Sequence, residues 1–517
     1  MFAAGQQDMQ QMDQYTMEKI GLPGVVLMEN AGARVVEEIV AMTNGNIRKV
    51  VILAGGGNNG GDGFVIARRL FDIGWEPVLC LLVNPDRLKG DAKIHFDVYV
   101  NRGLPVLHNW AQDNLTKLED EFDKADIIVD AILGTGVKGA VREPFKTVIS
   151  MVNALQGKKA VLSVDIPSGV ESDSGKVEST AIKATKTITF VYPKKGFFLQ
   201  DGPKCVGEWK AVDISVPPSI TSVLGLDMPQ VITEQLVKTS IPTRPQQGHK
   251  GTFGHALVIG GSRQYVGAPV YTAKAVLHSG AGLATLAVPE SIYPIVAAQN
   301  PESLMLPLPG ENGHFSDLAI AEISSRLQLF DCIAIGPGMG RFPNGEIWMK
   351  SFLSILQNQP IVVDADALYL LRNDLGLLKS CKGTVIITPH PGEMATLLNK
   401  TIKEVEENRI EVARKFANDH GVFLLLKGHR SIIACPDGSI YINPFGHDAL
   451  GKGGSGDVLT GLIASFLAQG ATPLHAMVSA SYLHARAGEE KAKELSHYGV
   501  MPLDIIDSIK HQLAILF

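Results

Sequence analysis

The chain has 517 residues, a net charge of −6 at neutral pH and a hydrophobic content of 45%. This length exceeds what one ordinary domain needs, and the small charge without a basic block excludes nucleic acid as a partner. The N-terminus lacks a signal-like apolar core, and no apolar stretch reaches the roughly 20 residues of a membrane helix. Five scattered cysteines without a C-x-x-C pair are typical of reduced thiols. We therefore predict a cytoplasmic protein of two or three domains without membrane contact.

Apolar runs alternate with helical patterns through the first half of the chain. Short apolar strands separated by helices indicate a parallel sheet with helices on both faces. The predicted strands lie at 49–54, 77–83, 126–132, 160–165 and 186–191.

From Pro217 to about Gly251 prolines and glycines interrupt this pattern, apart from one short helical run near 233–239. Such a change in composition marks a domain boundary. The alternation then resumes. The second half has predicted strands at 283–288, 332–336, 360–364, 384–388 and 421–427, and two amphipathic helices near 456–469 and 473–493. The predicted organisation is a first domain over 1–218, a linker over 219–250 and a second domain over 251–517.

A glycine-rich loop runs into an apolar helix near the C-terminus and contains Gly453, Gly454, Ser455, Gly456 and Asp457. Glycines let backbone N–H groups turn toward one point, and a helix start adds unpaired donors and its positive dipole. Phosphate is the usual ligand of such a site. A carboxylate there repels phosphate unless it takes up a proton or binds a metal. Asp457 is therefore predicted to be a catalytic base for a hydroxyl in phosphoryl transfer. A plain helix cap is the alternative, but it requires only one glycine.

A second glycine-rich loop, GGGNNGGDG at 55–63, follows the predicted strand 49–54 and precedes a helix. It matches the dinucleotide pattern G-x-G-x-x-G, but the next strand does not end in the usual acidic residue. Asn58 and Asn59 tolerate left-handed backbone and offer side-chain oxygens, which suit a cation beside a phosphate. Two anion loops predict two sites and two activities.

Asp130 and Asp165 interrupt apolar strands of the first half. A carboxylate in such a place is costly unless it binds something, and ligands bind at the carboxyl ends of parallel strands. Both residues are therefore candidates for a binding site, and a structural aspartate that caps the next loop is the alternative for each.

The segments GGGNNGGDG, DAILGTG (130–136), SVDIPSG (163–169) and PKKG (193–196) resemble the NAD(P)H-hydrate epimerase family. The resemblance implies a Rossmann-like three-layer α/β/α fold and potassium bound by Asn59, Asp130 and Ser168. Epimerisation at C6 requires the hydroxyl to leave and return on the other face, and Asp165 is the candidate for moving the proton. The implied substrate-binding residues are Asn58, Asn59, Gly60, Gly61, Asp62, Gly134, Thr135, Gly136, Val137, Lys138, Gly139, Ala140 and Asp165.

The second half resembles the ADP/ATP-dependent NAD(P)H-hydrate dehydratases, which have a ribokinase-like α/β fold. The motifs are HKGTFGHALVIGGS (249–262), GAP (267–269), IGPGMG (335–340), DADAL (364–368), TPHPGEM (388–394) and GGSGDVLTG (453–461). The resemblance implies ADP as phosphoryl donor, with ATP possible, together with Mg²⁺, and a homo-oligomer. The implied hydrate-site residues are Ala268, Gly338, Gly340, His390 and Asp457. The implied nucleotide-binding residues are Lys427, Gly428, His429, Arg430, Ser431, Gly453, Gly454, Ser455 and Gly456.

Together the two resemblances cover nearly the whole chain. They imply epimerisation of R and S hydrates of NADH and NADPH, and ADP-dependent dehydration of the S epimer to NAD(P)H with AMP and phosphate. One alternative is a ribokinase-like kinase for a small alcohol, which a stable phosphorylated product would favour. In the other, the N-terminal half is a non-catalytic nucleotide-binding module, although its Asp130, Asp165 and Ser168 argue against loss of activity.

Overall fold

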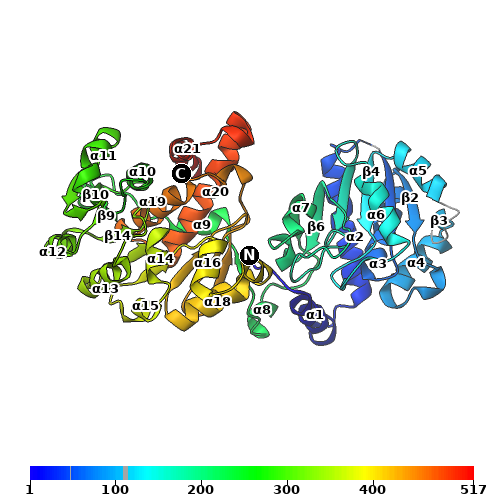
Figure 1. Cartoon of the computed structure of the whole chain (residues 1–517). Coiled ribbons are helices and arrows are strands. Elements are labelled where there is room, and N and C mark those ends of the chain that lie inside the picture. The colour runs from blue at the N-terminus through cyan, green and yellow to red at the C-terminus, as the bar shows by residue number, and fades with distance from the viewer. Residues whose placement is uncertain (47, 109–114) are drawn as a thin grey trace. The chain divides into compact units, whose positions relative to one another are not determined.

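The computed structural model describes residues 1–46, 48–108 and 115–517. The chain divides into two compact units, Met1–Pro229 and Gln230–Phe517. Each unit is built on one large sheet with helices packed against it, which confirms the predicted α/β class (Figure 1). Within the described residues, no helix is long and apolar enough to cross a membrane.

The first unit contains a seven-stranded parallel sheet in the order β3-β2-β1-β4-β5-β6-β7. The order 3-2-1-4-5-6 is that of doubly wound nucleotide-binding sheets, so the Rossmann-like prediction is confirmed. The strands are β1 (Lys49–Ala54), β2 (Glu76–Leu81), β3 (Val106–His108), β4 (Ile127–Ala131), β5 (Ala160–Val164), β6 (Lys186–Phe190) and β7 (Glu208–Val212). The helices are α1 (Gln6–Tyr15), α2 (Gly24–Met42), α3 (Asn58–Asp72), α4 (Gly90–Asn101), α5 (Leu115–Lys124), α6 (Phe145–Asn153), α7 (Gly202–Cys205) and α8 (Ile220–Val223).

Successive residues of the central strands pack into two different layers, because side chains alternate across a sheet. Val50 and Ile52 of β1 belong to a core that includes residues of α1, α2, α3 and α4. Val51 and Leu53 belong to a second core with residues of α5 and α6, the cyan helices of Figure 1. The unit is therefore a three-layer sandwich, as predicted.

The second unit contains a ten-stranded sheet in the order β11-β10-β9-β14-β15-β16-β17-β18-β19-β8. Neighbours from β11 to β17 are parallel, whereas β18 is antiparallel to β17 and to β19. The strands are β8 (Gln230–Val231), β9 (His255–Ile259), β10 (Leu283–Pro289), β11 (Leu304–Leu308), β14 (Cys332–Ile335), β15 (Ile361–Val363), β16 (Val385–Ile387), β17 (Phe423–Leu426), β18 (Ile432–Ala434) and β19 (Ile440–Ile442), and the hairpin β12 (Gly310–Glu311) and β13 (His314–Phe315) stands apart.

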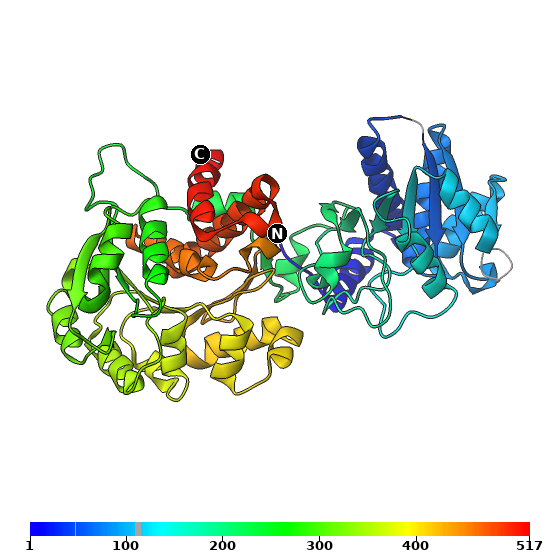
Figure 2. The same ribbon diagram turned by 45° about the horizontal axis from the view of Figure 1, so that its top comes forward.

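Two groups of helices cover the two faces of this sheet, as Figure 2 shows. One group comprises α9 (Glu234–Ser240), α10 (Gly267–His278), α19 (Ser455–Ala468), α20 (Pro473–Gly499) and α21 (Pro502–Leu516). The other includes α13 (Gly345–Ile355), α14 (Asp366–Leu371), α16 (Pro391–Leu398) and α18 (Arg409–His420), and α11 (Tyr293–Gln299), α12 (Leu318–Ser324), α15 (Gly376–Ser380) and α17 (Ile402–Glu407) are shorter elements.

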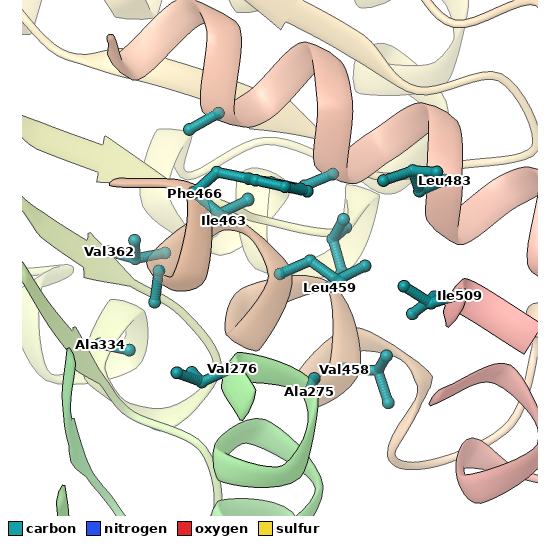
Figure 3. Packing of buried hydrophobic residues seen from close by; sticks show 14 of the residues in the cluster. Ala275, Val276, Ala334, Val362, Val458, Leu459, Ile463, Phe466, Leu483 and Ile509 are labelled. Atoms are coloured by element: carbon teal, nitrogen blue, oxygen red, sulfur yellow. The ribbon is translucent and has the colours of Figure 1, made fainter. Parts of the chain in front are cut away.

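Helix α19, which follows the C-terminal glycine-rich loop, is buried along its length. Figure 3 shows its side chains between α10, α20, α21 and the strands β14 and β15. Gly461 brings α10 close, because a Cβ there would lie 2.3 Å from the Thr272 carbonyl oxygen. The start of α19 is therefore held in a fixed position.

Part of the range predicted as a linker, 219–250, belongs to the second unit. Strand β8 pairs with β19 at the edge of the second sheet, and Val237 of α9 is fully buried in the core of that unit.

Candidate functional sites

A cleft of about 650 Å³ lies at the start of α19 in the second unit. Its wall contains Asp364 after β15, His390 after β16 and Lys427 after β17, together with the segment 443–457. These positions are carboxyl ends of parallel strands, where ligands bind in open α/β sheets. The cleft is therefore the candidate site of this unit.

The glycine-rich loop forms one wall of this cleft, since Gly453, Gly454, Ser455, Gly456 and Asp457 all line it. Gly454 is the N-cap of α19 and has a φ of 93°, a left-handed conformation that glycine adopts at low cost. The first turn of the 14-residue helix has N–H groups without helical partners. The loop thus has the geometry expected of an anion site, which stays a prediction.

Asp457 lies in the first turn of α19 and has an unusual environment. Burial, followed by the negative charge of Asp364, raises its pKa to about 7, although the charge of Lys427 opposes this shift. A carboxyl group with this pKa exchanges its proton near neutral pH, as a general base must.

Lys427 is ion-paired in the floor of the cleft. Its Nζ lies 2.7 Å from Asp364 Oδ1 and 3.7 Å from Glu393 Oε2. The Thr460 hydroxyl donates a 2.6 Å hydrogen bond to Asp364 Oδ2. Burial lowers the pKa of Lys427, but the charges of Asp364 and then Glu393 outweigh it and raise the pKa. Lys427, a predicted nucleotide-binding residue, is thus also the partner of a buried carboxylate.

His484 of α20 contacts Ser455, the first residue of α19. Its Nε2 donates to the Ser455 carbonyl oxygen at 3.0 Å and lies 3.1 Å from Ser455 Oγ. Burial lowers the pKa of His484 to about 4, so the imidazole is neutral at physiological pH. Asp364, Thr460 and His484 had no predicted role. Asp364 alone carried a signal, because it ends an apolar strand as Asp130 and Asp165 do.

The residues predicted for the hydrate site are not all on the cleft wall. His390 and Asp457 line it, but Ala268, Gly338 and Gly340 are outside the lining. A Cβ on Gly338 would lie 2.9 Å from Ala268 Cβ, so this glycine permits close packing. His390 caps α16, because its Nδ1 accepts hydrogen bonds from Gly392 N and Glu393 N at 3.0 and 3.3 Å.

Four of the five residues at 427–431 line the cleft, and the exception is Arg430. Its guanidinium group donates to the Gly446 carbonyl oxygen at 3.2 Å. At the rim, His447 and His497 each place Nδ1 2.9 Å from Asp448 Oδ1. Because His447 Nδ1 also accepts the N–H of Ala449 at 3.2 Å, this group is explained as a loop cap.

The first unit has a separate cavity of about 610 Å³. Eight of the predicted substrate residues line it: Asn58, Asn59, Asp62, Gly134, Thr135, Gly136, Val137 and Asp165. Lys138, Gly139 and Ala140 are outside the lining. Gly60 and Gly61 are also outside it. A Cβ on Gly60 would lie 2.0 Å from the Gly55 carbonyl oxygen, and a Cβ on Gly61 would lie 2.4 Å from Met28 Sδ. These glycines therefore let α3 pack closely.

Asp165 follows β5 and is held by three donors, all bonded to its Oδ1. They are Lys194 Nζ at 2.5 Å, Phe190 N at 3.0 Å and Thr189 Oγ1 at 3.1 Å. Lys194 has a side chain that is 1% exposed. The φ of Asp165 is 63°, an uncommon conformation for a residue other than glycine. A strained residue fixed to a buried cation is typical of a functional site.

Three more carboxyl groups line the same cavity: Asp13 of α1, Asp62 of α3 and Asp91 of α4. Burial, followed by the charge of Asp165, raises the pKa of Asp13 to about 6. Burial, with Asp165 and Asp13, raises the pKa of Asp62 well above its usual range. Asp62 was predicted, whereas Asp13 was not, because nothing in its polar N-terminal segment distinguishes it.

The three residues predicted to bind potassium lie in one buried cluster. Asp130 is completely buried and accepts hydrogen bonds from Ser163 Oγ, Ser168 N, Ser168 Oγ and Ile132 N. The Leu133 carbonyl oxygen accepts from Asn59 Nδ2 at 3.0 Å, and Leu133 N donates to Ser168 Oγ at 2.8 Å. Asn59 Oδ1 is buried, and within the described part of the chain it has no hydrogen-bond partner. An unpaired buried oxygen in a cluster that contains a carboxylate fits a hard cation.

Comparison with known proteins agrees with this division. Residues 256–511 match a family profile described as NAD(P)H-hydrate dehydratase, and residues 24–196 match one described as YjeF-related protein N-terminus. The bifunctional NAD(P)H-hydrate repair enzyme Nnr of Moorella thermoacetica is 38% identical over 516 residues, which cover 99% of this chain and 97% of the relative. The enzyme of the same name from Pyrobaculum aerophilum is 35% identical over 495 residues, 95% of this chain and 94% of the relative.

A solved structure also resembles the second unit. It is the ADP/ATP-dependent NAD(P)H-hydrate dehydratase of Bacillus subtilis, co-crystallised with ATP and Mg²⁺. It is 29% identical, has a TM-score of 0.49, and covers 56% of this chain and 99% of its own. Because the curated relatives match along nearly the full length, the chain belongs to the family of bifunctional NAD(P)H-hydrate repair enzymes.

Proposed function

We propose that this chain repairs hydrated NADH and NADPH, with epimerisation in the first unit and nucleotide-dependent dehydration of the S epimer in the second. The observation that carries the proposal is Asp457, a carboxyl group with a pKa of about 7 beside a glycine-rich helix start. A base and a phosphate site in one cleft are what phosphorylation of a substrate hydroxyl requires.

In the dehydration, ionised Asp457 accepts the proton of the 6-hydroxyl. The freed oxygen attacks the terminal phosphorus of the nucleotide, and the bond from that phosphorus to the bridging oxygen breaks, so that AMP leaves ADP with the bonding electrons. The N–H groups at the start of α19 stabilise the charge on the phosphoryl oxygens. Phosphate then leaves C6 with the bonding electrons, a proton leaves C5, and the ring double bond returns. Lys427 holds Asp364 and lowers the pKa of Asp457, so that the base is partly ionised at neutral pH.

We propose ADP as the phosphoryl donor, on the resemblance of the second half, with ATP as the alternative. The Bacillus subtilis relative was crystallised with ATP and Mg²⁺. Mg²⁺ binds largely through phosphates and water, so it enters this site with the nucleotide and needs few protein ligands.

We propose that potassium binds between Asn59, Asp130 and Ser168 in the first unit. The support is the unpaired Asn59 Oδ1 and the buried Asp130 carboxylate, which hydrogen bonds connect through Leu133 and Ser168. Potassium would supply a positive charge that compensates Asp130 and fixes the loops on which Asn59 and Ser168 lie. In the epimerase cavity, Asp165 exchanges a proton with the departing or returning oxygen at C6.

The test is recovery of reduced-nicotinamide absorbance from a mixture of both epimers of hydrated NADH, with ADP, ATP or no nucleotide. Fast recovery of the whole pool with one nucleotide would support both activities and identify the donor. Partial fast recovery followed by slow drift would contradict the epimerase. No recovery, with a stable phosphorylated product from a small alcohol, would support a kinase instead. Replacing K⁺ by Na⁺ is expected to slow epimerisation and leave dehydration of the pure S epimer unchanged.

A further inference from the structure

Epimerisation poses a geometric problem that one carboxylate does not solve. The hydroxyl leaves C6 from one face of the ring, and water returns to the other face. The departing oxygen needs a proton donor, and the returning water needs a proton acceptor, on opposite sides of the same carbon. Asp165 is fixed by three hydrogen bonds and cannot move from one face to the other.

We propose that Asp13 of α1 is the second proton-transferring residue of the epimerase, acting on the ring face opposite to Asp165. This inference rests on the proposed epimerase function and deepens it. Asp13 and Asp165 line the same cavity but come from separate elements, α1 and the end of β5. Two carboxyl groups on one cavity can address two faces of a bound ring.

The position of α1 supports this role, because α1 is tied to the segment that carries Lys194. Ala4 N donates to the Pro193 carbonyl oxygen, and Lys195 N donates to the Ala4 carbonyl oxygen, both at 2.9 Å. Lys195 Nζ also lies 3.1 Å from Asp8 Oδ2, within the first turn of α1. The same short segment therefore positions Asp165, through Lys194, and the helix on which Asp13 lies.

The charged groups that face Asp13 distinguish it from its neighbours. The charge of Asp165 raises the pKa of Asp13, and the charge of Lys194 lowers it. The charge of Asp13 in turn raises the pKa of Asp62. Among the described residues, Lys194 is the ion-pair partner of Asp165, and Asp13 has no cation at ion-pair distance. Burial leaves the pKa of Asp13 at about 6, so its proton exchanges easily. Burial, with the charges of Asp165 and Asp13, raises the pKa of Asp62 well above its usual range, and Asp91 lines the cavity at the start of α4.

The reaction balances with these two groups. In one direction Asp13 donates a proton to the 6-hydroxyl, the C6–O bond breaks with its electrons on oxygen, and water forms. The lone pair of the ring nitrogen N1 forms a double bond to C6. Water then adds to the other face, the double-bond electrons return to N1, and Asp165 accepts the proton. The reverse direction uses the same groups with exchanged roles, so the pair must hold exactly one transferable proton.

The experiment measures epimerisation of purified R and S hydrates of NADH by chromatographic separation, as a function of pH. For the wild type, kcat/KM in both directions is expected to fall above about pH 6, where the pair loses its shared proton. Asp13→Asn is expected to lower kcat by about 10²–10⁴-fold, with a smaller change in KM, and to abolish that pH limb. Asp13→Glu should restore part of kcat and the limb.

Two controls separate chemistry from folding. Dehydration of the pure S hydrate by the same Asp13→Asn protein, which depends on the second unit, should be unchanged. Glu18→Gln removes a negative charge from the exposed segment after α1 and should leave epimerisation unchanged. Asp13→Asn with wild-type kcat, or with low kcat and an unchanged pH limb, would overturn the role of Asp13. A wild type that does not epimerise would instead overturn the proposed epimerase function.

Discussion

The pair of Lys427 and Asp364 supports a quantitative prediction about the second unit. Lys427→Met keeps much of the side-chain volume but removes the ammonium group that lies 2.7 Å from Asp364 Oδ1. The Asp364 side chain is 1% exposed, so water does not compensate its charge. Without the ammonium group, this buried charge has lost its main partner. The hydroxyl of Thr460 still donates one hydrogen bond to the other oxygen.

Removing one partner of a buried ion pair costs about 3–5 kcal/mol, because a buried charge is left uncompensated. The remaining bond from Thr460 and the 17% exposure of Lys427 place the expected cost at about 3 kcal/mol, the lower end of this range. The same change removes the positive charge that lowers the pKa of Asp457. The pH limb of dehydration should therefore move to higher pH, and the rate at neutral pH should fall.

Calorimetry can measure the stability change, since a chain of two compact units is expected to unfold in more than one step. The transition of the second unit should move down by about 6–12 °C, at about 2–4 °C for each kcal/mol. The transition of the first unit should stay in place. Lys415→Met is a matched control, because Lys415 is 78% exposed and pairs with Asp419 at the surface, where an ion pair contributes about 0–1 kcal/mol.

A double-mutant cycle provides the decisive comparison. In the Asp364→Asn background, Lys427→Met should cost at least about 1 kcal/mol less than in the wild type, since no buried charge is left behind. Equal costs in both backgrounds, or a cost no larger than that of Lys415→Met, would refute the electrostatic reasoning.

Three further predictions concern α19 and its neighbours. Asp457→Asn should lower kcat of dehydration by about 10²–10⁴-fold and leave epimerisation unchanged. For the wild type, kcat/KM should rise with pH through about 7, as Asp457 ionises, and a flat profile would count against its role as base. His484 has a folded pKa of about 4 against 6.5 ordinarily, so the unfolded state binds the extra proton between these values. The free energy of unfolding of the second unit should then fall by about 3 kcal/mol as the pH falls through this window. The His484→Gln variant should lack this loss when its stability is measured against pH. Gly461→Ala should destabilise this unit by about 1–3 kcal/mol in urea unfolding, because Cβ would meet the Thr272 carbonyl oxygen at 2.3 Å. Alanine in an unconstrained helix would stabilise by up to about 1 kcal/mol, so a gain in stability would contradict the packing argument.

The interior of both sheets was predictable because buried parallel strands appear in the sequence as continuous apolar runs. The five strands predicted in the first half match β1, β2, β4, β5 and β6 within two residues at each end. The start of α19 was predicted within one residue, since glycines and an aspartate before an apolar helix are a local signal.

Other features depend on tertiary structure and leave no local signal. Strands β8, β18 and β19 have two or three residues each, too few to show a period. Asp13 and Asp165 are about 150 residues apart in sequence, and only the fold brings them to one cavity. Asp364 and Lys427 are 63 residues apart in sequence, so their pairing also depends on the fold. The pKa of Asp457 depends on both charges and on burial.

The boundary between the units determines where the two activities can be separated into independent proteins. Ala3 N donates to the Pro229 carbonyl oxygen at 2.8 Å, so the first unit is closed on itself at Pro229. A C-terminal fragment that begins at Gln230 keeps β8 on the sheet edge and α9 against α20. One that begins at residue 251 would expose the backbone of β19 and the apolar surface beneath Val237, which favours aggregation. A gene that encodes such a protein can therefore be divided at 229/230. This point lies within the stretch from Pro217 to Gly251, and not at its C-terminal end.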